Sequence, residues 1–99
     1  MDYHARKALR MIRECVYAGR YRVLEHFVER MDLRGLFWAD ILAVIESARD
    51  AQDDGPDRFG RAKWRVSGRT TDGMDLEIVC ALDRDERGRQ AVLITAYWH

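Results

Sequence analysis

The hydrophobic period of this chain changes once along its length, and this change constrains the fold more than any other feature of the sequence. In the first half, apolar residues recur at steps of three and four, the pattern of helices with one buried face. This pattern predicts three helices, at roughly residues 2–18, 24–34 and 37–49. After residue 60, apolar and polar residues alternate, which predicts three strands at roughly residues 61–69, 74–83 and 90–98. We therefore expect an α+β fold in which three N-terminal helices pack on one face of a three-stranded antiparallel meander.

The segment between these two halves carries turn-forming residues. Asp53, Asp54, Gly55, Pro56 and Asp57 lie within residues 50–60. Such residues favour turns and interrupt helices, so we interpret this segment as a loop.

Size and composition predict a single soluble domain spanning residues 1–99. A chain of 99 residues is large enough for one core but not for two. Cys15 and Cys80 lie far apart in apolar surroundings and have no metal-binding spacing, so we expect reduced thiols and a cytoplasmic location. No apolar run approaches the roughly 20 residues of a membrane span, so we expect no membrane partner.

Composition also gives no indication of a cofactor. The histidines His4, His26 and His99 share no spacing typical of metal ligands, and the chain has no glycine-rich phosphate-binding loop. We therefore expect neither a cofactor nor a bound metal.

The strand pattern also predicts a register. Residues that pair directly across two strands point to the same face, so even-numbered residues, which are the apolar ones, must oppose even-numbered residues. A three-residue loop at Thr71–Gly73 then places Val66 opposite Ile78, and a five-residue loop at Arg84–Gly88 places Ile78 opposite Ile94. The even-numbered residues, Trp64 and Trp98 included, should face the helices.

The same register predicts a polar face on the other side of the sheet. One predicted row joins Ser67, Glu77 and Thr95, and a second joins Arg69, Asp75 and Tyr97, with Lys63 and Arg65 further along the first strand. This face has two interpretations that the sequence does not separate. It is either an ordinary solvated sheet face with cross-strand ion pairs or a surface that binds a ligand.

Charges are balanced overall but segregated along the chain. Residues 1–22 carry six Arg or Lys against two acids, residues 40–57 carry six acids against one Arg, and residues 58–69 carry five basic residues and no acid. Arg6, Arg10 and Arg13 fall on one stripe of the first predicted helix. The segregation fits either solvated faces or a surface for an anionic ligand, whereas zero net charge argues against binding nucleic acid by bulk charge alone.

Short strings in order along the chain carry a family resemblance. They are Tyr21-Arg22-Val23 leading to His26, Arg30-Met31, Gly68, Ile78-Val79 and Ile94-Thr95-Ala96-Tyr97. With these strings the chain resembles a bacterial domain-of-unknown-function family, number 4258, which is similar in layout to BrnT-like and RelE-like ribonuclease toxins of toxin-antitoxin pairs. The resemblance implies an endoribonuclease that acts on RNA, free or ribosome-bound, and is neutralised by a cognate antitoxin protein. The chain departs from the family pattern at Phe27, where a small residue is usual, and in ending at Trp98-His99.

RNA cleavage needs a general base, cations for the charged transition state and often an acid for the leaving oxygen. His26 and Arg30 lie one helical turn apart, and Glu77 and Tyr97 supply a second base and a base-stacking or proton-donating phenol. Hence we predict His26, Arg30, Glu77 and Tyr97 as catalytic residues, and as substrate-binding residues Lys63, Arg65, Arg69 and Thr95. The competing hypothesis is a non-catalytic protein- or RNA-binding module on the same scaffold, in which His26 is simply a partly buried residue hydrogen-bonded to backbone.

Overall fold

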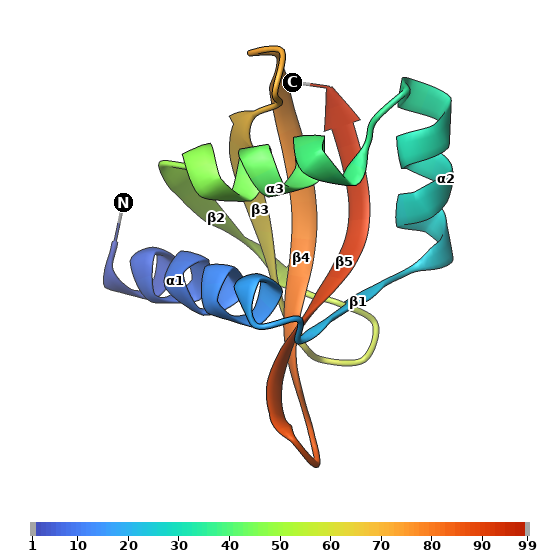
Figure 1. Cartoon of the computed structure of the whole chain (residues 1–99). Helices are drawn as coiled ribbons and strands as arrows, with labels where there is room; N and C mark the ends of the chain where they lie inside the picture. The colour runs from blue at the N-terminus through green and yellow to red at the C-terminus, as the bar shows by residue number, and fades with distance from the viewer. Residues whose placement is uncertain (1, 99) are drawn as a thin grey trace.

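The computed structural model describes residues 2–98, so Met1 and His99, the two ends of the predicted domain, lie outside the described residues. Three helices and five strands make up this part of the chain (Figure 1). The helices are α1 (Tyr3–Tyr17), α2 (Glu25–Arg34) and α3 (Trp38–Ser47). The strands are β1 (Tyr21–Val23), β2 (Asp50–Pro56), β3 (Ala62–Arg69), β4 (Asp75–Asp85) and β5 (Gly88–Trp98). They form one mixed sheet in the order β1-β5-β4-β3-β2.

The expected three-stranded antiparallel meander is therefore wrong, because the sheet gains a strand at each edge. β1 pairs parallel with β5, and β2 pairs antiparallel with β3. β1 has only three residues, too few to show a period of two, and its pairing joins residues far apart in the chain. β2 was interpreted as a loop because it contains three Asp together with Gly55 and Pro56, yet it needs only one buried side chain, Ala51, on an edge where turn residues are tolerated.

α1 and α3 lie against one face of the sheet, and α2 stands beside β5 (Figure 1). α1 begins at Asp2, whose Oδ1 accepts the Ala5 amide at 2.7 Å and so satisfies one of the free N–H groups at the helix start. The core between helices and sheet includes Ile12, Phe27, Ile41 and Val66, all fully buried. The helices thus cover one sheet face only.

Arg13 does not belong to the surface stripe predicted for the first helix. Its guanidinium donates to the carbonyl oxygens of Ile45, Glu46 and Ala48 at the C-terminal end of α3. A cation at this position satisfies carbonyl groups that have no partner within the helix and matches the negative end of the helix dipole. Arg13 therefore joins α1 to α3.

The register between β3 and β4 confirms the prediction that Val66 lies opposite Ile78. The register between β4 and β5 was predicted wrongly. Asp85 pairs with Gly88 across a two-residue turn, and Ile94 forms a bulge, because Val79 pairs with Thr95 while Cys80 pairs with Leu93. Ile78 therefore lies opposite Ala96 rather than Ile94.

The bulge changes which residues of β5 share a face. Leu93 and Ala96 both belong to the helix-side core, whereas Ile94 does not. Glu77 now lies beside Tyr97 instead of Thr95, and none of the described residues of β5 pairs with Asp75. Trp98, expected in the core, has 43% of its surface exposed at the end of β5.

None of the helices within residues 2–98 combines the length and the apolar character needed to cross a membrane.

Candidate functional site on the open face of the sheet

We call the sheet face opposite α1 and α3 the open face, since no helix of the described residues lies across it. Lys63 and Arg65 point to this face from β3, where they pair with Ala81 and Val79 of β4. Ala81 and Val79 are buried although they lie outside the helix-side core. Lys63 and Arg65 are their cross-strand neighbours, and both side chains remain partly exposed, at 26% and 37%.

A cluster of charges occupies the middle of the open face. The Asp54 carboxylate from β2 forms ion pairs with Lys63 Nζ at 3.4 Å and with Arg65 Nε at 3.1 Å through different oxygens. Arg65 also lies 3.9 Å from Glu77 on β4 and donates to the side chain of Gln52 at 2.7 Å. Two cations and two carboxylates from three neighbouring strands therefore meet in one place.

Glu77 is the most enclosed carboxylate of this cluster, with only 8% of its surface exposed. The Ser67 hydroxyl donates to its Oε2 at 3.4 Å. Tyr97 lies beside Glu77 in the sheet, and burial together with the charges of Glu77 and Asp54 raises the pKa of the Tyr97 phenol. The phenol therefore stays protonated at neutral pH and can donate a hydrogen bond or a proton.

A groove of about 410 Å³ continues the open face toward the start of α2. Its lining is mostly apolar and comes from three places: the start of α2, the segment between β2 and β3, and the open face itself. The lining residues are Leu24, His26, Pro56, Asp57, Arg58, Phe59, Arg61, Lys63 and Ile94. Ile94 reaches this groove because it is the bulged residue of β5.

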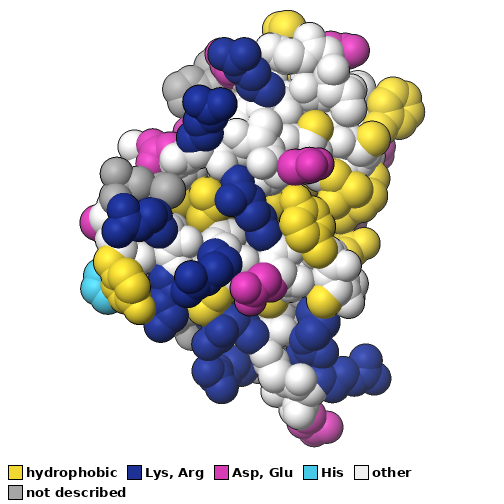
Figure 2. All heavy atoms as spheres, turned by 60° about the vertical axis from the view of Figure 1, so that its left-hand side comes forward, with side chains coloured by type: hydrophobic (Ala, Val, Ile, Leu, Met, Phe, Trp, Pro, Cys, Tyr) yellow, Lys and Arg dark blue, Asp and Glu magenta, His cyan; other side chains and the backbone are white. Residues whose placement is uncertain are grey.

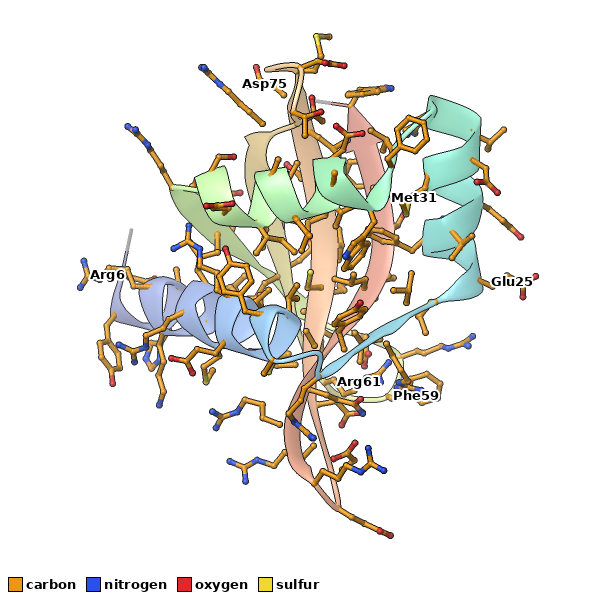
Figure 3. The ribbon with its side chains drawn as sticks, in the orientation of Figure 1. Arg6, Glu25, Met31, Phe59, Arg61 and Asp75 are labelled. Carbon is orange, nitrogen blue, oxygen red and sulfur yellow. The ribbon has the colours of Figure 1, made fainter. Side chains whose placement is uncertain are left out.

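The wall formed by residues 57–61 is held by its own hydrogen bonds. Asp57 Oδ1 accepts the amides of Phe59 and Arg61, and its Oδ2 accepts Arg61 Nε at 2.6 Å. Arg61 also bridges to Asp83 on β4 at 3.2 Å. Phe59, with Arg58 and Arg61 near its ring, remains exposed on this wall (Figure 3). These contacts give an exposed aromatic ring a defined place beside two cations.

His26 and Arg30 contact each other on α2. Arg30 Nε donates to His26 Nε2 at 3.3 Å, and His26 Nδ1 lies 4.0 Å from Glu29. The histidine is about half exposed, so the alternative of a partly buried residue bonded to backbone does not describe it. His26 shares the groove with Lys63, whereas Arg30 is not among the lining residues.

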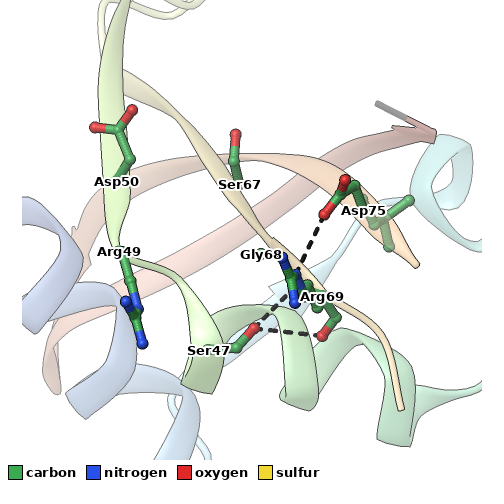
Figure 4. Close-up of a pocket in the computed structure, with 8 residues that line it drawn as sticks. Ser47, Arg49, Asp50, Ser67, Gly68, Arg69 and Asp75 are labelled. Carbon is green, nitrogen blue, oxygen red and sulfur yellow. Dashed lines mark hydrogen bonds and ion pairs between the residues drawn. The ribbon is translucent and has the colours of Figure 1, made fainter. Parts of the chain in front are cut away.

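Arg69 lies in a different place. It forms an ion pair with Asp75 at 3.5 Å, and its backbone exchanges hydrogen bonds with the Ser47 hydroxyl of α3 (Figure 4). A second pocket of about 650 Å³ surrounds this group at the ends of β3 and α3. Both charged ends of the Arg69–Asp75 pair are largely exposed, so this pair fits the interpretation of an ordinary surface ion pair.

The structure thus brings together four of the eight predicted site residues, Lys63, Arg65, Glu77 and Tyr97. It places Thr95 beside Val79 on the same face, and it joins the cluster to His26 through the groove. Sequence analysis missed Asp54, because its segment was interpreted as a loop, and also the wall of residues 57–61. An aromatic residue between two arginines, Arg58-Phe59-Gly60-Arg61, was the available signal for that wall.

The remaining titratable groups offer little for other chemistry. Within residues 2–98, no three side chains of His, Cys, Asp or Glu lie close enough together to hold a metal ion. Cys80 is fully buried, which raises the pKa of its thiol to about 12 and makes it a poor nucleophile.

Comparison with known proteins identifies the family of the chain. Residues 23–98 match the family described as a domain of unknown function (DUF4258), and the chain belongs to this family. The match covers the open face and the groove but not α1. Neither curated proteins nor solved structures give a match.

Proposed function

We propose that the chain is a toxin-like, metal-independent endoribonuclease whose active site is the open face of the sheet. The observation that carries the proposal is the convergence of Lys63, Arg65, Glu77 and Tyr97 on a face that no helix of the described residues covers. Two cations for a phosphate, a carboxylate base and a protonated phenol are the groups that RNA transesterification requires.

In this proposal the scissile phosphate binds Lys63 and Arg65 and displaces Asp54 from them. The Glu77 carboxylate takes the proton of the 2′-hydroxyl, and the 2′-oxygen attacks phosphorus. The bond from phosphorus to the 5′-oxygen then breaks, and Tyr97 donates a proton to that oxygen. The products are a 2′,3′-cyclic phosphate and a free 5′-hydroxyl.

The groove supplies the binding of the neighbouring nucleotide. Phe59 offers a face on which a base can stack, as is common for unpaired RNA bases. His26 has its Nε2 occupied by Arg30, so this pair contacts a flanking phosphate or acts as a second proton-transfer group after Arg30 moves. The proposed setting is the cytoplasm, where a cognate antitoxin would cover the open face, and the RNA is free or ribosome-bound.

The test is induction of the chain in bacteria, followed by growth measurement and mapping of RNA ends. We expect the wild-type chain to arrest growth and cut RNA. Glu77→Gln and Arg65→Ala should each lower the cleavage rate by about 10²-fold or more, since they remove a general base and a charge-stabilising donor. Arg49→Ala removes an exposed arginine that belongs neither to the charge cluster nor to the lining of the groove, and it is the matched control.

A non-catalytic binding module is the second candidate, and Asp54 favours it. This carboxylate already pairs with both Lys63 and Arg65, which is the arrangement of a structural ion-pair network. Normal growth and intact RNA at high soluble expression of the wild-type chain would reject the ribonuclease and support this candidate. Cleavage that survives both Glu77→Gln and Arg65→Ala would place any active site elsewhere.

A further inference from the structure

The outer surface of α1 carries cations and aromatic rings in alternation. Tyr3, Arg10 and Tyr17 follow one another at seven-residue steps and therefore lie on one stripe of the helix. Tyr3 and Tyr17 are 60% and 59% exposed. Arg6 and Lys7 are exposed on the same outer side, where Glu14 is the one exposed acid of α1. This stripe uses no residue of the core.

A second group of cations lies on the arm formed by the end of β4 and the start of β5. Arg84 and Arg89 lie directly opposite each other in this hairpin, and Arg87 occupies its turn. All three are exposed. Like charges directly opposite each other in an antiparallel pair destabilise the hairpin, and no acid in residues 2–98 forms an ion pair with either Arg84 or Arg89. An anionic ligand would remove this repulsion.

The two groups form one continuous surface. Arg84 and Arg89 follow Leu82 and Ala91 on the helix side of the sheet, so they point toward the side that α1 occupies. Arg20, just after α1, donates to the Arg89 carbonyl at 2.8 Å. Burial raises the pKa of the Cys15 thiol on α1, and the charges of Arg89 and Arg20 partly offset this rise, so both cations lie near the helix. Figure 2 shows Lys and Arg side chains spread over α1 and the arm, with few acids between them.

We propose that the outer face of α1 and the β4–β5 arm together bind single-stranded nucleic acid. This surface lies on the opposite side of the sheet from the candidate active site, and α1 precedes the part of the chain that matches the family. Cations at intervals contact a phosphate backbone, while exposed rings between them stack on unpaired bases. The exposed rings lie singly among the cations and form no apolar patch of the kind found at the centre of many protein interfaces, which favours a nucleic acid over an acidic protein as the ligand.

The experiment measures fluorescence anisotropy of labelled single-stranded RNA and DNA of about 20 nucleotides as the salt concentration is raised. The DNA probe has no 2′-hydroxyl and cannot be cleaved by the proposed transesterification. The full chain is compared with Arg10→Gln/Arg84→Gln/Arg89→Gln and with Arg49→Gln as the matched control. The slope of log K against log salt is negative, and each lost phosphate contact makes it less negative by about 0.7. The slope of the triple variant should therefore be less negative by about 2, and that of the control should equal the wild-type slope.

Tyr17→Ala tests stacking separately from charge. We expect binding at least about fivefold weaker with an unchanged salt slope, because a lost stacking contact removes no phosphate contact. Phe37→Ala, which removes another exposed aromatic ring at the far end of α3, should bind as the wild type does. If the triple variant fails to fold, as judged by circular dichroism, Arg10→Gln alone should make the slope less negative by about 0.7.

Three results would overturn the proposal. They are absence of binding by the wild-type chain at low salt, a triple variant that behaves like Arg49→Gln, and competition by polyglutamate as strong as that by unlabelled DNA. The last result would instead assign the surface to an acidic protein. Binding of the DNA probe is measured without cleavage, so a failure of the proposed ribonuclease activity and a failure of this surface are separate results.

Discussion

Replacing Gly68 with alanine should destabilise the fold through a single steric contact. The Gly68 backbone lies outside the left-handed region, so its conformation suits any residue, and alanine would by itself reduce the entropy of the unfolded chain. A Cβ at this position, however, would overlap the Val44 carbonyl oxygen of α3 and lie 2.9 Å from Ser47 Oγ. Because the Val44 carbonyl oxygen is a backbone atom, this overlap is removed only if the whole of α3 moves away from the sheet by roughly 1 Å.

The magnitude follows from what α3 buries. Its residues Ile41, Val44 and Ile45 are fully buried against the sheet, so any movement loosens their packing. Overpacking of this kind costs about 1–3 kcal/mol. For a domain of this size, a loss of about 2 kcal/mol lowers the melting temperature by roughly 8–16 °C.

Thermal and urea denaturation of Gly68→Ala would measure this loss. Gly73→Ala is the matched control, because Gly73 has a φ of +79° and open space around it. Gly73→Ala should lower the free energy of unfolding through backbone strain alone, by about 1–2 kcal/mol. A Gly68→Ala chain as stable as the wild type would refute the argument that α3 approaches β3 closely enough to exclude a side chain.

Two further predictions concern contacts of α3. Arg13→Ala should lower the free energy of unfolding by about 1.5–3 kcal/mol in urea denaturation, because it leaves carbonyl groups at the end of α3 without their charged donor. Arg13→Lys should recover only part of this loss, since the three N–H donors of lysine lie on one nitrogen and cannot reproduce the planar fork of the guanidinium, and full recovery would contradict the role of the guanidinium. Hydrogen bonds from the Thr71 side chain and the Phe37 amide lower the pKa of Asp40 in the folded chain. The charge of Asp40 therefore stabilises the fold at any pH above the pKa of an unfolded aspartate, near 3.9. This stabilisation is lost as the pH falls through the lower pKa of the folded chain. Asp40→Asn should therefore melt lower than the wild type at pH 7 and lose less stability between pH 5 and pH 3, and equal losses over this range would contradict it.

The sequence predicted those elements whose stability comes from a local hydrophobic pattern. α1 has six buried residues at helical spacing, and β3 alternates between buried and partly exposed side chains over residues 63–67. β1 and β2 have no such pattern. Tyr21–Val23 is a strand only because β5 lies beside it, and Asp50–Pro56 only because β3 does. When a strand is short or lies at a sheet edge, its pairing with a distant segment produces no recognisable hydrophobic pattern in its own sequence.

The residues of the candidate site were predicted better than their arrangement. Lys63, Arg65 and Glu77 were placed on one face because the register of β3 against β4 follows from parity and one turn. Tyr97 was assigned to the wrong row, since neither the two-residue turn nor the bulge changes the alternation enough to be read from sequence. Asp54 was missed because an aspartate before a Gly-Pro pair is typical of a turn.

The Ile94 bulge connects the two parts of the candidate site. If Ile94 were paired instead of bulged, the pairing at the turn would continue along β5 and place Ala96, not Tyr97, opposite Glu77. The bulged residue, Ile94, lines the groove together with Leu24 and His26. The bulge therefore both brings the phenol to the enclosed carboxylate and adds an apolar residue to the lining of the groove. Bulges often occur where a sheet must redirect a side chain at a binding site, and this one links the polar cluster to the groove that would hold the neighbouring base.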